Sequence, residues 1–414
     1  MLDQTFCDLP RLLRTGRLDF AGRSQLNMDG DILYAVVADH VTSARRKAGQ
    51  RIPQVWRRTD TNATPHAGRP DKAARKRYDV AMSLANLRNQ MITSFYDLGP
   101  EQVLQAVESV GFSCNGHQLA LNSYENRVYQ IGLDGDASIV AKFYRPGRWS
   151  DAAIIEEHQF TLELETLDIP AVPPLLIGGD TLFHFGEHRF SLYPLKAGRA
   201  PDLENRAHLQ QLGRYFGRIH GLGATAVFHH RPALTVHTFG DDAYEFLMEH
   251  AFIPAELERA YERLAEDLLD MVEARLRAVD PQQIRLHGDA HPGNILWKDN
   301  APYILDFDDA RMGPAVQDLW MFLSGDRTQM TTTLDTLLTA YSQFHDFDCR
   351  ELSLIEPLRT LRIMHHAAWL AERWSDPAFK RAFPWFNSQQ YWEEHILTLK
   401  EQAAAMQEEP LAWS

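Results

Sequence analysis

Three polar residues between positions 289 and 306 have the chemistry that a phosphate-transfer site requires. Asp289 and Asn294 lie five positions apart in a stretch that contains Gly and Pro, which predicts a loop. Asp306 follows a short apolar run and is expected to emerge from the end of a strand. A carboxylate can orient or deprotonate a hydroxyl group, and Mg2+ prefers oxygen ligands. The pattern predicts magnesium-assisted transfer of a phosphoryl group to a hydroxyl.

The interval between Asp289 and Asn294 matches the Asp-to-Asn interval of the kinase catalytic loop. In that loop the Asp contacts the acceptor hydroxyl and the Asn binds metal. A single Asp or Asn in a loop is usually a turn residue. The whole pattern of residues 287–294, followed by a strand that ends at Asp306, is far more specific than either residue.

The remaining polar residues of this region have less specific patterns. His287 and His291 resemble metal ligands, but Mg2+ prefers oxygen, so we expect both to fix the loop as hydrogen-bond donors. Asp308 is expected either to take a second magnesium ion or to cap a turn. Asp318 is expected to cap a helix or to bind back to the loop, and either role is structural.

A lysine upstream has the position of a phosphate ligand. Lys142 lies in the apolar run 139–144, where a lysine usually extends to water. Its Val-Ala-Lys context is similar to the kinase strand whose lysine holds the α- and β-phosphates and pairs with a helix glutamate. Glu156 and Glu157 follow on the next predicted helix. Glu157 heads an apolar stripe with Phe160, Leu164 and Leu167, so we expect Glu157 to be the partner.

The loop expected to cover the phosphates precedes position 127 and contains no glycine. Asn122, Ser123 and Asn126 can offer hydroxyl, amide and backbone donors to phosphate oxygens. The alternative is an ordinary surface hairpin, since Asn and Ser are common turn residues.

Two structural regions are expected to position these residues. Strand-like runs dominate residues 91–195 and helical patterns dominate 196–414, which predicts an α+β protein of two lobes. The aromatic residues of 330–400 are expected to line an acceptor groove or to form a helical core. The expected elements are a helix over 100–110, strands over 127–132, 138–144, 175–177 and 189–193, a helix from Ser150, and a hairpin over 295–297 and 303–305.

Residues 1–90 differ in composition from the rest. They contain 16 Lys and Arg, nine Asp and no Glu, whereas the other 324 residues hold 26 basic and 47 acidic side chains. Residues 43–78 combine clustered Arg and Lys with three prolines, and a segment of this kind cannot bury enough apolar surface to become ordered. We expect an over-extended start, with Met91 as the native first residue. The alternatives are a disordered tail and a basic arm for nucleic acid or an acidic partner.

Composition excludes several classes of protein. The net charge of −14 disfavours non-specific binding of nucleic acid by the main body. The sequence contains no run of 18 apolar residues, so it predicts no membrane span. No secretory signal is visible at the start. The three cysteines lie far apart and form no metal or redox spacing. We expect a cytoplasmic protein that binds neither membranes nor nucleic acid.

Several segments together resemble the bacterial stress response kinase A family. They are 121–130, 142–146, 156–160, 285–289, 293–297 and 308–320, and the similarity extends over about 91–410. That family belongs with choline kinases and aminoglycoside phosphotransferases among the relatives of protein kinases. The central residue of 306–308 differs from that of some relatives, at a position expected to serve packing only.

The resemblance implies a two-lobe protein-kinase-like fold and a monomeric serine/threonine protein kinase of stress response. It places the catalytic base at Asp289, the magnesium ligands at Asn294 and Asp306, and the ATP contact at Ser123. The site pattern by itself favours a small hydroxylated metabolite or an aminoglycoside as acceptor. A third hypothesis is a pseudokinase scaffold that binds nucleotide, against which the intact Lys142, Asp289, Asn294 and Asp306 argue.

Overall fold

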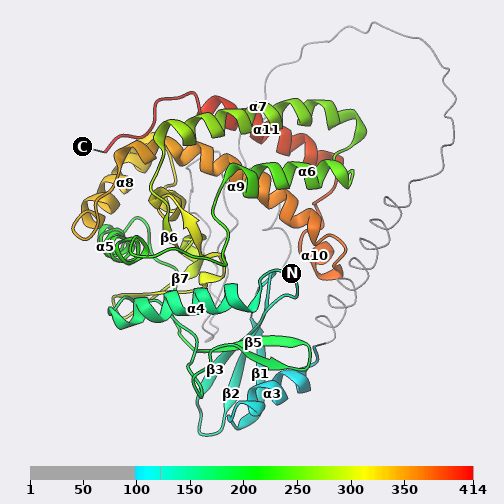
Figure 1. Cartoon of the computed structure of the whole chain (residues 1–414), viewed down its shortest axis with the longest axis vertical. Coiled ribbons are helices and arrows are strands. Elements are labelled where there is room, and N and C mark those ends of the chain that lie inside the picture. The colour runs from blue at the N-terminus through cyan, green and yellow to red at the C-terminus, as the bar shows by residue number, and fades with distance from the viewer. Residues whose placement is uncertain (1–97, 122, 414) are drawn as a thin grey trace, which may run out of the picture.

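Five antiparallel strands form the N-terminal lobe in the computed structural model, which describes residues 98–121 and 123–413 (Figure 1). The strand order β1-β2-β3-β5-β4 places β3 at the centre of the sheet. The buried face of α3 packs with the sheet in one apolar cluster. The elements are α3 (Pro100–Ser109), β1 (Cys114–Leu121), β2 (Arg127–Leu133), β3 (Ser138–Phe143), β4 (Phe183–Phe185) and β5 (His188–Pro194).

The alternation of side chains along β3 determines where Lys142 points. Ile139, Ala141 and Phe143 are buried in the apolar cluster of the sheet. Successive side chains of a strand lie on opposite faces, so Lys142 lies on the other face. Its backbone pairs with Val128 on one side and Ser191 on the other. The amine is therefore held on the central strand and faces away from the sheet's own core.

Helix α4 (Asp151–Thr166) connects the sheet to the second lobe. Ser150 is its N-cap, as predicted, and its hydroxyl accepts a hydrogen bond from the backbone N–H of Ala153 at 3.2 Å. Phe160 and Leu164 are fully buried in the core of the helical lobe. The expected apolar stripe is wrong at its end, because Leu167 follows the last helical residue and is 47% exposed.

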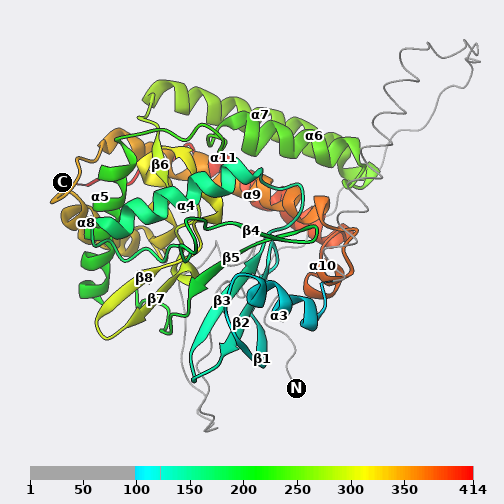
Figure 2. The same ribbon diagram turned by 60° about the horizontal axis from the view of Figure 1, so that its bottom comes forward.

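The rest of the chain forms a mainly helical lobe that contains two small sheets (Figure 2). β6 pairs with β9, and β7 pairs with β8 as the predicted hairpin. The longer elements are α5 (Arg206–Gly223), α6 (Asp242–Glu249), α7 (Ala255–Val279), α8 (Arg327–Tyr341), α9 (Ile355–Glu372), α10 (Pro377–Ala382) and α11 (Gln389–Ala405). The short ones are η1 (His237–Asp241), β6 (Ile284–Leu286), η2 (Pro292–Asn294), β7 (Ile295–Lys298), β8 (Ala301–Ile304), η3 (Phe307–Asp309), β9 (Arg311–Gly313), η4 (Ala315–Asp318), η5 (Trp320–Phe322) and η6 (Cys349–Leu354).

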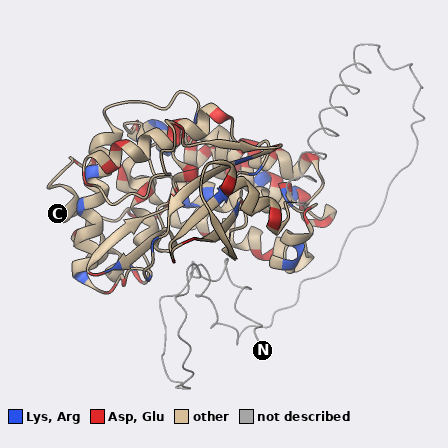
Figure 3. Ribbon diagram, turned by 90° about the horizontal axis from the view of Figure 1, so that it is seen from below, with Lys and Arg blue, Asp and Glu red and all other residues tan. Residues whose placement is uncertain are grey.

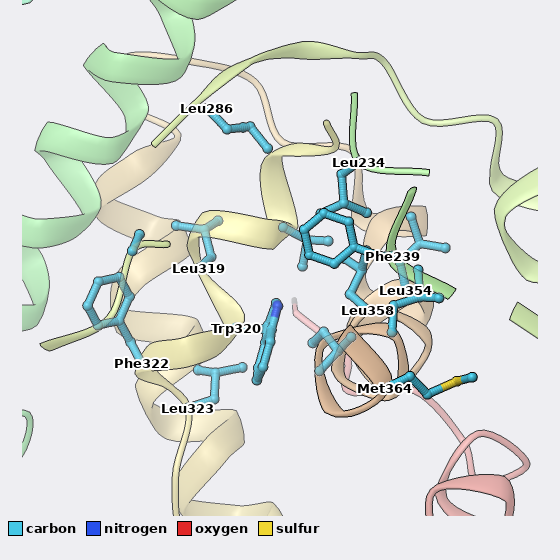
Figure 4. Packing of buried hydrophobic residues seen from close by; sticks show 14 of the residues in the cluster. Leu234, Phe239, Leu286, Leu319, Trp320, Phe322, Leu323, Leu354, Leu358 and Met364 are labelled. Atoms are coloured by element: carbon cyan, nitrogen blue, oxygen red, sulfur yellow. The ribbon is translucent and has the colours of Figure 1, made fainter. Parts of the chain in front are cut away.

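One apolar core joins these helices and supports the loops between them. Figure 4 shows Trp320 between Leu323 and Leu358, with Phe239 and Leu234 on the far side. All of these side chains belong to the same buried cluster. The aromatic residues near the C-terminus are core as well, since Phe379, Phe386 and Trp392 are at most 2% exposed. Of the two interpretations of this segment, the structure favours the helical core for these three residues.

The α+β arrangement of two lobes agrees with the sequence pattern. One predicted strand is absent from the described residues, and one observed strand was not predicted. Residues 175–177 form no strand; Ile177 makes an isolated bridge with Asp180, and β4 lies further along. β1 was not anticipated, because its mostly exposed residues show no apolar alternation. The hypotheses for residues 1–90 lie outside the described residues.

The described surface mixes the two signs of charge. Lys, Arg, Asp and Glu are interspersed over the ribbon in Figure 3. Among the described helices, none is long and apolar enough to cross a membrane.

Candidate active site

The loop between β6 and β7 is held by its own histidines. His287 donates from Nε2 to the carbonyl of Leu305 at 2.7 Å, and its Nδ1 accepts from the N–H of Asp289 at 3.3 Å. Nδ1 of His291 accepts from the N–H of Gly293 at 3.0 Å. Both histidines fix the loop as predicted, His287 as a donor, but the hydrogen bond of His291 within the loop is one that it accepts.

Asp318 attaches this loop to the helical core. Its carboxylate accepts from the backbone N–H groups of His287 at 2.7 Å and Gly288 at 2.9 Å, and the ring of His220 lies 3.2 Å away. Asp318 therefore binds back to the loop, one of the two predicted roles. Gly288 adopts φ +85°, and a Cβ there would lie 2.1 Å from the carbonyl oxygen of Asp309. Only glycine allows this approach between the two segments.

Asp289 projects from the fixed loop into a polar environment. Its Oδ1 lies 2.7 Å from Nη2 of Arg362 on α9, and its Oδ2 lies 3.4 Å from Nε2 of His291. The side chain is 22% exposed. Burial opposes ionisation, but the positive charge of Arg362 and the contact with His291 hold the pKa of Asp289 well below its ordinary value. Asp289 is a carboxylate at neutral pH.

Asn294 and Asp306 lie at adjacent ends of the β7–β8 hairpin. Ile295 pairs with Ile304, and the N–H of Leu305 donates to the carbonyl of Asn294 at 2.9 Å. Nδ2 of Asn294 donates to the backbone carbonyl of Asp289 at 2.9 Å. This bond uses the amide nitrogen and leaves the amide oxygen for another ligand. Asp306 has φ 56°, a left-handed conformation rare outside glycine, and its side chain is 46% exposed.

These two residues offer oxygen atoms of the kind that Mg2+ binds. Among the described residues, no cluster of three or more His, Cys, Asp or Glu side chains is arranged to hold a metal ion. Mg2+ commonly uses one or two protein oxygens and completes its shell with phosphate and water. Asn294 and Asp306 fit that requirement better than the requirement of a metal held by protein alone.

Lys142 connects the sheet to this hairpin. Its Nζ lies 2.8 Å from Oδ1 of Asp306 and 3.4 Å from Oδ1 of Asp308. Burial works against the charged amine, but the two carboxylates hold the pKa of Lys142 well above its ordinary value. The sequence pattern anticipated Lys142 but not this pair of partners.

Glu157 is buried near Lys142 without forming an ion pair with it at 4 Å or less. Its Oε2 has no hydrogen-bond partner among the described residues. Burial raises the pKa of Glu157 to about 7. Glu156 faces elsewhere, because its carboxylate accepts the backbone N–H groups of residues 229–231 at 2.5–3.0 Å. The expected contact between Glu157 and Lys142 is therefore electrostatic only in this structure.

Ser123 lies exposed in the connection between β1 and β2, and its hydroxyl accepts from the N–H of Asn126 at 3.3 Å. Asn126 donates from Nδ2 to Oδ2 of Asp308 at 3.0 Å. This bond ties the turn to the segment that carries Asp306. Asn122 lies outside the described residues.

Arginines that the sequence analysis did not single out complete the site. Arg148 contacts Asp308 and also Oδ1 of Asp309 at 2.8 Å. Burial opposes ionisation of Asp308, but Lys142 and Arg148 lower its pKa. Asp308 is thus bound by side chains of the N-terminal lobe, which neither of the two predicted roles describes. No local spacing marks Arg148, since its partners lie 160 positions away.

A second set of contacts joins the Ser123 turn to the C-terminal helices. The carboxylate of Glu125 lies 2.9 Å from Nε of Arg373 and accepts from Nε1 of Trp369 at 2.7 Å. The adjacent Tyr124 ring lies 4.9 Å from the ring of Phe383. We call Glu125, Arg373 and Trp369 the interlobe contact. It holds the turn against α9 and the segment after it.

Comparisons with known proteins identify the family of the chain. Residues 117–354 match the phosphotransferase enzyme family. Stress response kinase A of Escherichia coli K12 is 40% identical over 323 residues, which are 78% of this chain and 98% of that protein. A serine/threonine protein kinase named RdoA of Salmonella typhimurium is 39% identical over 78% of this chain and 98% of that protein.

Solved structures of low identity share the fold. Amicoumacin kinase hAmiN, in complex with AMP-PNP and Ca2+, has a TM-score of 0.60 at 16% identity, over 78% of this chain and 98% of that one. A microcompartment-associated aminopropanol kinase has a TM-score of 0.56 at 15% identity, over 73% of this chain and 97% of that one. The fold is therefore protein-kinase-like, with the sheet-rich and helical lobes described above.

Proposed function

Because this chain belongs to the stress response kinase A family of phosphotransferases, we propose that it is an ATP- and Mg2+-dependent serine/threonine protein kinase of bacterial stress response. One observation carries the proposal. Lys142 of the N-terminal lobe contacts Asp306 at 2.8 Å, at the end of the hairpin that begins beside Asn294. The contact unites a phosphate-binding amine, oxygen ligands and the Asp289 loop at one place.

Each residue then has a role that its environment supports. Lys142 and the turn at Ser123 bind the phosphates of ATP, and Glu157 is a buried carboxyl group whose charge interacts with Lys142. Asn294 and Asp306 would hold Mg2+, which when bound would neutralise charge on the phosphates. Asp289 orients the acceptor hydroxyl and accepts its proton. Since phosphoryl transfer has a largely dissociative transition state, Asp289 acts mainly by orientation and late in the reaction.

The name of one relative supports a protein as acceptor. The Salmonella relative of 39% identity is named as a serine/threonine protein kinase. The solved structures are named for small acceptors, but at 16% identity or less they carry the fold alone. The location in the cytoplasm and the monomeric state stay predictions.

Transfer of labelled phosphate from ATP to a protein fraction, compared with a metabolite fraction, tests the proposal. Asp289→Ala should abolish transfer while binding of MgATP survives, because Asp289 contacts the acceptor and not the nucleotide. Asp306→Ala should weaken binding of MgATP, measured by calorimetry. The control is Asp335→Ala on the exposed face of α8, which should change neither measurement.

Three results would contradict this proposal. Turnover by Asp289→Ala would refute its role in orienting the hydroxyl. Label found only in metabolites would leave a small-molecule kinase. Binding of MgATP without any transfer, including transfer to the protein itself, would leave a nucleotide-binding scaffold.

A further inference from the structure

Arg362 pairs with the carboxylate that is proposed to orient the acceptor hydroxyl. Its Nη2 lies 2.7 Å from Oδ1 of Asp289, and its side chain is 39% exposed. It extends from α9 in the helical lobe, whereas Lys142 and Ser123 come from the other lobe. Of the groups that contact the Asp289 carboxylate, Arg362 is the most exposed and has the longest flexible stem.

The two oxygens of Asp289 face different neighbours. Oδ2 lies 3.4 Å from Nδ2 of Asn294 and 3.4 Å from Nε2 of His291, both within the loop that carries the proposed metal ligand. Oδ1 faces Arg362. A hydroxyl that approaches from the side opposite the metal ligand therefore meets Oδ1 and has to displace the guanidinium, at least in part.

The neighbouring arginines are committed to other carboxylates. Arg148 contacts Asp308 and Asp309, Arg311 contacts Asp309 at 2.7 Å, and Arg373 contacts Glu125 at 2.9 Å. Among the described residues, Arg362 forms its ion pair with the carboxylate of Asp289. When Asp289 turns to the acceptor hydroxyl, Arg362 loses its partner. An acceptor with a negative charge can then pair with the released guanidinium, whereas a neutral acceptor leaves it to water.

We propose that Arg362 is a specificity-determining residue that selects acceptors with a negatively charged group beside the hydroxyl, in the first place acidic peptide segments around Ser or Thr. The inference rests on the proposed function and names the acceptor class of the same site. A guanidinium binds carboxylate or phosphate through two parallel hydrogen bonds, which places the neighbouring hydroxyl in a defined position. It repels cationic acceptors by the same charge.

Steady-state kinetics on a panel of Ser peptides tests this inference. The peptides carry Asp and Glu, only Ala, or Lys and Arg around one Ser, and glycerate, glycerol and choline form an anionic, a neutral and a cationic small-molecule arm. The wild-type full chain should favour acidic over basic peptides in kcat/KM by about tenfold or more. Arg362→Gln should reduce that preference by about tenfold, with KM for ATP unchanged.

Two further variants separate charge from structure. Arg362→Lys should restore part of the preference, because it keeps the charge but loses the two-pronged geometry. Arg362→Glu should reverse the preference toward basic peptides. The matched control is Arg350→Gln, which removes an arginine that is 67% exposed and pairs with Asp348. Arg350→Gln should behave as the wild type. Thermal unfolding of each variant shows whether it is folded.

The outcomes distinguish this inference from the proposed function. The inference is overturned if the wild type phosphorylates acidic and basic peptides equally, or prefers basic ones. It is also overturned if Arg362→Gln keeps the preference for acidic peptides. In each case the proposal of a protein kinase stands. An increase in KM for ATP in Arg362→Gln would show that Arg362 binds the nucleotide, which also overturns the inference. Transfer to glycerate alone supports Arg362 but refutes the protein acceptor. Absence of transfer to every acceptor refutes both.

Discussion

Replacing Glu157 by Gln should stabilise the protein at alkaline pH and have little effect at acidic pH. The Glu157 side chain is 3% exposed, and its Oε2 has no hydrogen-bond partner among the described residues. His158 lies 3.7 Å away, but burial lowers its pKa to about 3, so it is neutral and supplies no positive charge. Lys142 is engaged by Asp306 and Asp308. An ionised Glu157 is therefore poorly compensated.

The magnitude follows from the pKa of Glu157. Burial raises this pKa from 4.5 to about 7. At about 1.4 kcal/mol for each pKa unit, the full difference corresponds to about 3 kcal/mol. Because the folded pKa is raised, the unfolded chain loses its proton first. The contribution to stability is complete below about pH 4.5 and is lost as the pH rises through about 7.

Urea unfolding at pH 5 and pH 9, followed by tryptophan fluorescence, measures this effect. The gain in unfolding free energy of Glu157→Gln over the wild type should be larger at pH 9 than at pH 5 by roughly 2 to 3 kcal/mol. The control Glu165→Gln lies on the exposed face of the same helix. It should change stability by less than about 0.5 kcal/mol at both pH values.

A gain that is the same at both pH values would show that Glu157 does not ionise with a raised pKa. A loss that grows at pH 9 would show that Glu157 forms an ion pair with Lys142 in solution. The second result would restore the contact that the sequence pattern predicts and would refute the environment described for this carboxyl group.

Two further substitutions test how the site is held. Gly288→Ala combines φ +85° with a Cβ 2.1 Å from the carbonyl oxygen of Asp309, so urea unfolding should show a loss of about 3 kcal/mol or more. Gly178→Ala, at φ +64° with open space around it, should lose only about 1 kcal/mol. Glu125→Gln removes the carboxylate that Arg373 contacts at 2.9 Å. It should cost about 2 to 4 kcal/mol and raise KM for ATP, because the Ser123 turn is released.

Features that depend on neighbouring residues were predictable from the sequence. The N-cap of α4 depends on Ser150 and the three residues that follow it, and the β7–β8 hairpin depends on the two-residue turn Asp299–Asn300, both at positive φ. The position of Lys142 on a strand follows from the apolar run 139–144 that contains it. The strand missed at β1 has mostly exposed side chains, so burial left no alternating pattern.

Asp289, Asn294 and Asp306 became candidates by type and spacing alone, because the loop and hairpin that carry them are local structures. Their partners are not local. Lys142 and Asp306 are 164 positions apart, and Glu125 and Arg373 are 248 positions apart. An arginine in an ordinary helix or turn carries no mark of the carboxylate that it will meet. The contacts of Arg148, Arg362 and Arg373 were therefore decided when the lobes packed together, because only packing brings distant charges within a few ångströms in an environment that water screens weakly.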